Sequence, residues 1–186
     1  MREKKQIKNK KGFTLIEILV SIFLFSIVIG SIITIFILAV RQQNIILRNQ
    51  LALNQISYAV EFMSRSLRMA SKELGSNCLS TYGCNYETTS NGIKFINALD
   101  NNDCQLFFLE NEQLKYKKSY WSAGIPLTAT SSMRVRGLRF ILQGECQDDI
   151  FQPRVTIFLE VENPIQGGEK IKIQTTISQR NLDVQY

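Results

Sequence analysis

The chain has 186 residues, which is enough for one ordinary globular domain together with a further segment. Its formal net charge of +6 is unevenly placed, because residues 1–12 carry +5 and the rest of the chain, with 16 basic and 15 acidic residues, carries +1. A nearly neutral chain beyond residue 12 argues against a nucleic-acid-binding surface there. The lack of histidine excludes Ser-His-Asp and Cys-His catalysis, and neither a P-loop nor a GxGxxG motif is present.

The chain begins with a basic segment that is followed by an apolar one. The basic residues are Arg2, Lys4, Lys5, Lys8, Lys10 and Lys11, against Glu3. From Ile18 to Val40 there are 23 residues without a charge. A helix of that length is roughly 35 Å long, enough to cross a bilayer core of about 30 Å. Because Lys-rich ends stay in the cytoplasm, we expect a single-pass protein of the cell (inner) membrane whose residues after Val40 are extracytoplasmic.

Two ordinary membrane segments fit this pattern less well. A cleaved secretory signal has an apolar core of about 7–15 residues that ends at small residues, whereas this run is longer and its small residue, Gly12, precedes it. An uncleaved signal anchor explains the length, the charge and the orientation. It does not explain Glu17, since a carboxylate within such a segment costs a few kcal/mol on insertion scales and needs a partner or a role.

The segment "KGFTLIE", which ends at Glu17, resembles the class III signal of type IV pilins and of the pseudopilins of type II secretion. The resemblance is strong over residues 8–40 and general beyond them. It implies that a prepilin peptidase cuts between Gly12 and Phe13 and that the new amine of Phe13 is N-methylated. It also implies that the apolar helix stays in membrane lipid until an inner-membrane assembly platform transfers it into a filament of pilin or pseudopilin subunits.

Within this resemblance Glu17 acquires a physical role. After cleavage its carboxylate can neutralise the Phe13 amine of a neighbouring subunit, a pair that is worth more at low dielectric than in water and that fixes the axial register. The alternatives are a contact with Phe13 of the same chain, or a snorkelling or protonated Glu17 near the interface. Many major pilins have a proline in this helix, but the first proline here is Pro126, so Gly30 with Ser31 is the expected weak point.

The helical pattern continues beyond the apolar run. Apolar residues recur at spacings of three and four and predict one buried face: Leu53, Ile56, Val60, Met63, Leu67, Ala70 and Leu74. Glu61 can reach Arg65 one turn later. Gly75 is a suitable residue to end the helix, so we expect one helix from about Phe13 to Leu74.

The remainder, residues 75–186, is expected to form a β-rich head. Short strands are predicted at residues 93–98, 105–109 and 114–118, with a hairpin turn around Asn111. Residues 154–161 and 171–177 alternate between apolar and polar, and the loop "NPIQGGE" between them suits a wide hairpin. The apolar phase shifts across Gly137, which predicts a bulge. The predicted fold class is α+β, a long N-terminal helix packed on an antiparallel sheet.

Together these observations predict four segments. They are a cleaved leader (1–12), a transmembrane or filament-core helix (13–40), an amphipathic helix (41–74) and an extracytoplasmic head (75–186). We find no internal repeat.

The four cysteines lie in the exported part, where an even number favours disulfides. Three connectivities are possible, and we prefer Cys78–Cys84, which closes a small loop, with Cys104–Cys146. A zinc site is the competing interpretation, but the sequence has neither a CxxC motif nor a histidine. The carboxylates of "DNND" and of Asp148/Asp149 are more typical of loops than of a calcium site. The segment "YKKSYW" is more typical of a strand with a solvated face than of a nucleic-acid contact.

The sequence therefore predicts a structural protein rather than an enzyme, with no cofactor. The hypothesis is a minor pilin or pseudopilin, and the length, the β-rich head and the ending "QTTISQRNL" loosely resemble the J-type minor pseudopilins. The presence of Glu17 argues against the tip-most subunit type, which typically lacks this acid. The alternatives are a competence-type pseudopilin that aids DNA uptake and a plain membrane-anchored extracytoplasmic domain, and a nucleic-acid partner is disfavoured by the charge.

Overall fold

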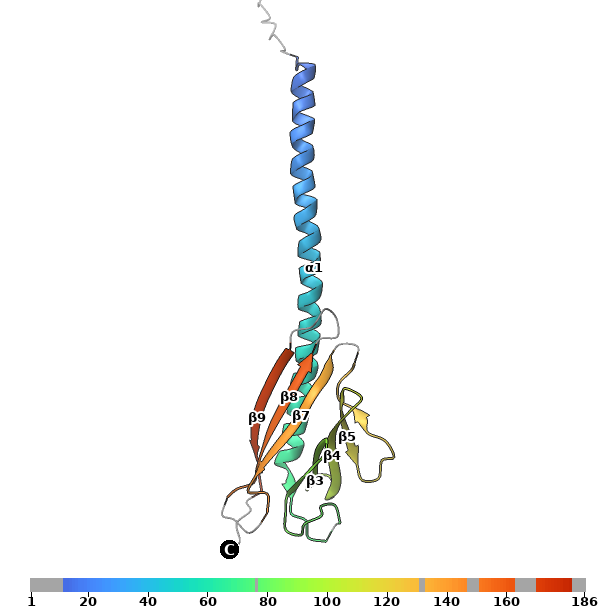
Figure 1. Ribbon diagram of the computed structural model, residues 1–186, viewed down its shortest axis with the longest axis vertical. Coiled ribbons are helices and arrows are strands. Elements are labelled where there is room, and N and C mark those ends of the chain that lie inside the picture. The colour runs from blue at the N-terminus through green and yellow to red at the C-terminus, as the bar shows by residue number, and fades with distance from the viewer. Residues whose placement is uncertain (1–11, 76, 131–132, 147–150, 163–169, 182–186) are drawn as a thin grey trace, which may run out of the picture. The chain divides into compact units, whose positions relative to one another are not determined.

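The computed structural model describes residues 12–75, 77–130, 133–146, 151–162 and 170–181 (Figure 1). Within these ranges it has one long helix, α1 (Leu15–Arg68), followed by nine strands in two antiparallel sheets, so the predicted α+β class is confirmed. The contacts divide the chain into residues 1–47 and residues 48–186, and each unit is described by itself.

In the first unit, α1 is exposed at every residue up to 47, as are residues 12–14 before it. Its few hydroxyls bond within the helix, since Ser21, Ser26 and Ser31 donate to carbonyls four residues earlier at 2.7–2.9 Å. These polar side chains therefore need no water. The helix also continues through Gly30 and Ser31 without a break, so the expected weak point is not a helix break.

In the second unit, the last five turns of α1 bury one face. The buried apolar residues are Ala52, Ile56, Ala59, Met63 and Leu67. The predicted stripe was wrong at its two ends, because Leu53 is 44% exposed and Leu74 is 67% exposed. The two alanines, which the sequence analysis did not include, let the strands approach the helix closely at this face.

The helix ends at Arg68, six residues before the predicted end at Leu74. The cause lies in distant donors that take the last helical carbonyls. The Tyr86 hydroxyl donates to Leu67 O at 2.7 Å, and Arg180 N donates to Arg68 O at 2.8 Å. The chain then enters a short strand, and Gly75, with φ of 108°, serves a later turn instead of the helix end.

The first sheet has six strands in the order β1-β3-β4-β5-β6, with β2 also paired to β3. They are β1 (Ala70–Ser71), β2 (Tyr86–Thr89), β3 (Gly92–Asn97), β4 (Asp103–Glu110), β5 (Gln113–Lys118) and β6 (Ile125–Pro126). The predicted strands at 93–98, 105–109 and 114–118 correspond to β3, β4 and β5. Asn111 and Glu112, with φ of 52° and 59°, form the two-residue turn between β4 and β5, which confirms the hairpin.

The second sheet has the order β7-β8-β9. Its strands are β7 (Arg134–Gln143), β8 (Arg154–Glu162) and β9 (Lys170–Ser178), drawn as neighbouring arrows in Figure 1. The register shifts between Val135 and Gly137, so the predicted bulge is confirmed. The predicted loop "NPIQGGE" lies outside the described residues.

One core joins the helix to both sheets. Met63 and Leu67 of α1 lie in the same buried cluster as residues of the first sheet, such as Phe95 and Phe107, and of the second sheet, such as Ile157. Phe62 adds edge-on contacts with Phe107 and Tyr116, at centroid distances of 5.9 and 5.2 Å. The helix face is therefore covered by strands from both sheets.

The disulfides differ from the pairing we preferred. The bridges are Cys78–Cys104 and Cys84–Cys146, and all four cysteines are bonded. The chain path separates Cys78 from Cys84: Asn85 N donates to Glu145 O at 2.7 Å, which brings Cys84 beside Cys146. Cys78 lies over the first sheet, where its sulfur is 3.7 Å from Phe95 O, close to the strand that carries Cys104.

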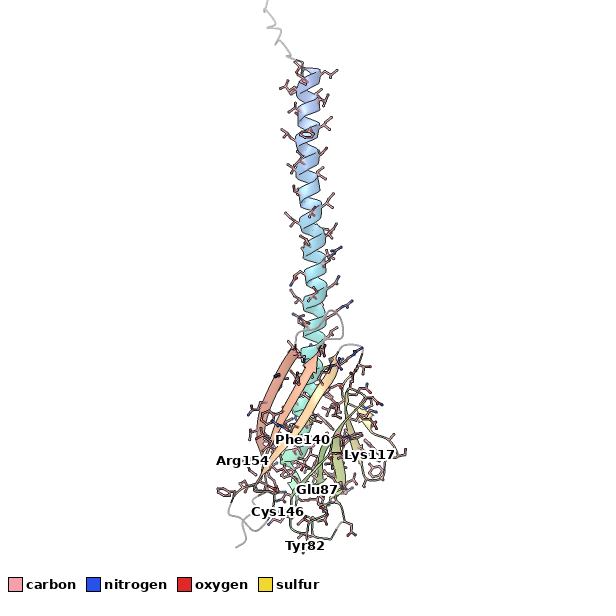
Figure 2. The ribbon with its side chains drawn as sticks, viewed as in Figure 1. Tyr82, Glu87, Lys117, Phe140, Cys146 and Arg154 are labelled. Atoms are coloured by element: carbon pink, nitrogen blue, oxygen red, sulfur yellow. A yellow bond between two sulfur atoms is a disulfide. The ribbon has the colours of Figure 1, made fainter. Side chains whose placement is uncertain are left out.

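The loop that carries Cys78 and Cys84 is organised by a buried carboxylate. Glu73 is 3% exposed, and its two carboxylate oxygens accept hydrogen bonds from the backbone N–H groups of Gly75, Asn77, Cys78 and Leu79 at 2.8–3.2 Å. Such charge-assisted bonds are stronger than neutral ones. Glu73 thus ties the loop internally, one disulfide ties it to Cys104 of β4, and the other ties it to Cys146, which follows β7. Figure 2 shows Tyr82 and Cys146 at the same end of the second unit.

Candidate processing and assembly site

The predicted cleavage site lies immediately before the helix. Gly12 and Phe13 are non-helical, and the side chain of Phe13 is 77% exposed. A Cβ atom built on Gly12 would meet nothing within 4 Å, and its φ is not in the left-handed region. Neither the packing nor the backbone conformation of the described residues therefore requires glycine at position 12.

Helix α1 starts at a capping residue that was not predicted from the sequence. Thr14 precedes the first helical residue, and its carbonyl accepts from Glu17 N at 3.1 Å and from Ile18 N at 3.3 Å. Its hydroxyl oxygen also accepts from Glu17 N at 3.3 Å. Thr14 is thus the N-cap and Glu17 is the third helical residue, the spacing of a capping box. The sequence "TLIE" carried this signal.

This position gives Glu17 a second, local role beside the predicted one. A carboxylate in the first turn is favoured by the helix dipole, typically by about 0.3–1 kcal/mol. However, the Glu17 side chain is exposed and forms no ion pair or hydrogen bond with any described residue, Phe13 included. Its carboxylate is therefore available to another molecule, whereas its backbone N–H is already used.

The surface that follows Glu17 is apolar on every side. Exposed large hydrophobic residues cover the whole circumference of α1 from Leu15 to Val40. By length and composition, α1 is the one described helix that could cross a membrane. A helix that is apolar all round needs lipid or other helices as its surroundings.

The other candidate residues are engaged inside the second unit. Asp100 of "DNND" forms an ion pair with Lys118, and Asp103 accepts a hydrogen bond from Ser119 at 2.5 Å. The hydrogen bond to Asp100 raises the pKa of the Lys118 ammonium. Lys115 pairs with Glu110 at 2.7 Å. Lys118 of "YKKSYW" and Lys115, which directly precedes that segment, therefore both have carboxylate partners within the chain. Among the described residues, no cluster of Asp, Glu, Cys or His has the composition of a metal site.

Comparison with known proteins identifies the start of the chain. Residues 7–33 match the family model of the prokaryotic N-terminal methylation motif, the class III signal of type IV pilins. The motif supports a type IV pilin or pseudopilin. No curated protein and no solved structure matches the chain.

Proposed function

We propose that this chain is a minor pilin or pseudopilin, a structural subunit of a type IV pilus or of a type II secretion pseudopilus. The observation that carries the proposal is the methylation motif at residues 7–33, together with a helix that begins within it and whose apolar surface is exposed from Leu15 to Leu47. A prepilin peptidase cuts between Gly12 and Phe13, and the Phe13 amine is N-methylated. Before cleavage the subunit is anchored in the inner membrane, with residues 1–12 in the cytoplasm and the residues after Val40 outside.

In the proposed assembly, Glu17 receives the positive amine of Phe13 from a neighbouring subunit. The exposed and unpartnered Glu17 carboxylate supports this proposal, as does the use of the Glu17 backbone N–H by Thr14. Helix α1 exchanges lipid contacts for contacts with other pilin-type helices at the assembly platform. The disulfide-braced second unit forms the extracytoplasmic head.

The experiment that tests the proposal is the identification of the mature N-terminus. We expect N-terminal sequencing and intact mass of membrane-extracted protein to give a chain that starts at Phe13. Because Gly12 has free space and an ordinary φ, Gly12→Ala and Gly12→Leu should both fold. Cleavage should nevertheless survive Gly12→Ala better than Gly12→Leu, since a peptidase subsite for glycine excludes bulk.

Two results would contradict the proposal. A product that retains Met1 would favour the plain membrane-anchored domain. A product cut after Val40 would favour a secretory signal, and equal cleavage of the two Gly12 variants would remove the peptidase as the reason for glycine.

A further inference from the structure

The second sheet has one face in the core and one turned away from it. Alternate residues of β8 (Val155, Ile157, Leu159 and Val161) are buried, so the residues between them and their cross-strand partners form the opposite face, which we call the outer face. Its residues are Arg134, Gly137, Arg139, Ile141 and Gln143 of β7, Arg154, Thr156, Phe158, Glu160 and Glu162 of β8, and Lys170, Lys172, Gln174, Thr176 and Ser178 of β9. Arg136, the extra residue of the bulge, joins this face through its bond to Glu162.

The outer face is basic although the chain beyond residue 12 is nearly neutral. It carries six basic residues and two acidic ones. One half of it is internally paired, because Arg136 bonds to Glu162 at 2.5 Å and Lys170 lies 3.5 Å from Glu160. The hydrogen bond from Arg136 lowers the pKa of the Glu162 carboxyl.

The turn between β4 and β5 completes this paired half. The Glu112 carboxylate of that turn contacts Arg136 and lies 3.4 Å from Arg134.

The cations in the other half of the outer face are not paired in this way. Arg139, Arg154 and Lys172 have no carboxylate partner among the residues that the structure describes. Figure 2 shows Arg154 at the start of β8.

A hollow lies among these cations. The bulge places Gly137, which has no side chain, opposite Glu160, and Lys172 pairs with Glu160 from β9. The resulting hollow of about 580 Å³ is lined mainly by outward-facing residues, among them Arg139, Phe158 and Lys172. The Arg139 guanidinium lies 5.1 Å from the centroid of the Phe158 ring.

An apolar side chain lies close to the hollow. Ile141, the next outward residue of β7 after Arg139, is 43% exposed. The outer face thus combines cations that have no carboxylate partner among the described residues, an exposed apolar residue and a cavity large enough for a bulky side chain.

We propose that the outer face binds an acidic segment of a partner protein, with carboxylates on Arg139 and Lys172 and an apolar side chain in the hollow. Charge complementarity argues for an acidic partner. Two observations argue for a protein and against a nucleic acid. Glu160 and Glu162 lie among the cations, where they repel a continuous phosphate backbone but suit a surface of mixed charge. The Phe158 ring is already covered by Arg139, so it is not free to stack on a base.

The test uses the full chain in detergent micelles and three labelled probes. They are a peptide that alternates Glu with Leu and Phe, the same peptide with Gln in place of Glu, and a 20-base-pair DNA duplex. We expect the acidic peptide to bind more tightly than the other two, with an affinity that falls as salt is added.

Matched variants locate the binding on this face. Arg139→Glu with Lys172→Glu should weaken binding of the acidic peptide by roughly tenfold or more. The control, Lys94→Glu with Lys117→Glu on the first sheet, makes the same change in net charge and should alter it by less than about twofold. Gly137→Leu should fill the hollow and weaken binding several-fold, because a Cβ there meets only Glu160 Cβ at 3.7 Å.

Three results would overturn the proposal. The first is that the Gln peptide binds as tightly as the acidic one, and the second is that Arg139→Glu with Lys172→Glu has no effect on binding. The third is that the DNA duplex binds more tightly than the acidic peptide and loses binding in the Arg139→Glu, Lys172→Glu variant. Each variant is compared by thermal midpoint with the parent chain, and the milder Arg139→Gln with Lys172→Gln replaces a reversal that unfolds the protein. None of these measurements depends on cleavage or filament assembly, so their failure is distinct from failure of the proposed function.

Discussion

Two stretches of the same helix have opposite relations to their own chain. In α1 from Leu15 to Leu47 every side chain is exposed, although most are large and apolar. From Arg48 to Arg68 the helix buries a single face of five apolar residues and turns its charged residues outward, where Glu61 bonds to Arg65 at 2.6 Å. The backbone geometry is the same in both, so the difference lies in which molecule covers the apolar surface.

The comparison shows how a pattern of apolar residues predicts a partner. One apolar stripe can be covered by a sheet of the same chain, and α1 meets both sheets there. An apolar surface that covers the full circumference cannot be buried by one small head. The stretch from Leu15 to Leu47 therefore depends on other molecules to cover it.

The largest effect is expected at Glu17, in the first stretch. Glu17→Gln and Glu17→Leu should both insert into the membrane, because removal of the charge makes the helix more apolar. Both should still be cleaved after Gly12. Incorporation into filaments should fail, because the Phe13 amine of the neighbour would be buried without its partner, at a cost of about 3–5 kcal/mol. The ratio of membrane-bound to filament-incorporated protein measures this loss.

Thr14→Val is the matched control for the local role of Glu17. It removes the capping hydroxyl, which should cost the helix start about 1 kcal/mol, and it leaves the carboxylate in place. If Thr14→Val impairs incorporation as much as Glu17→Leu does, the helix cap is what matters. Normal incorporation of Glu17→Leu would show that the carboxylate does not set the register.

The sequence predicted those parts of the molecule that depend on short-range patterns. The strict alternation of β8, the turn at Asn111 and the bulge at Gly137 each arise from a few adjacent residues, and all three are present. The motif around Gly12 and Glu17 is equally local. Its residues are recognisable in the sequence without knowledge of the fold, and the capping role of Thr14, which is equally local, was not predicted.

The features that were not predicted depend on residues far apart in the chain. The helix ends at Arg68 because Tyr86 and Arg180 supply donors to its last carbonyls, and no property of residues 69–75 reveals them. The disulfide pairing depends on the path of the loop that Glu73 organises. The basic outer face forms because three separated strands bring their cations together, which a net charge near zero conceals.

The second-largest effect is expected for the disulfides, which belong to the second unit alone. Loss of Cys84–Cys146 by paired Ser substitutions should lower the free energy of unfolding of the head by about 4 kcal/mol, and loss of Cys78–Cys104 by about 3.5 kcal/mol. The order follows from sequence separations of 62 and 26 residues. Urea unfolding measures the change, and peptide mapping without reduction checks the pairing. A linked Cys78–Cys84 peptide would contradict the structure.

A smaller effect separates the two stretches of α1 directly. Met63 is fully buried, so Met63→Ala should leave a cavity and destabilise the head by about 3 kcal/mol. Leu24 is 56% exposed, and Leu24→Ala should change the same unfolding transition by less than about 0.5 kcal/mol. Equal effects in urea unfolding would mean that the first stretch also packs against the head.

The smallest effect at neutral pH is expected for Tyr116, which contacts the helix through Phe62. Burial raises the pKa of Tyr116 to about 12 from an ordinary value of 10.0. The folded state therefore holds this proton more tightly than the unfolded state. The protonated Tyr116 hydroxyl therefore contributes to stability below pH 10, and this contribution is lost as the pH rises from about 10 to about 12. Tyr116→Phe removes the titrating hydroxyl and retains the ring.

The variant should consequently differ from the parent chain mainly in alkali. At neutral pH we expect Tyr116→Phe to change the unfolding free energy by less than about 1 kcal/mol, because the aromatic contact remains. Between pH 10 and 12 its stability should fall less steeply than that of the parent chain. Thermal unfolding at several pH values gives the slopes, and absorbance at 295 nm should show one late-titrating tyrosine that is missing from the variant. Identical slopes would mean that the Tyr116 hydroxyl is hydrated in the folded state, and that the helix from Arg48 to Arg68 is packed less tightly on β5 than the burial of its apolar face indicates.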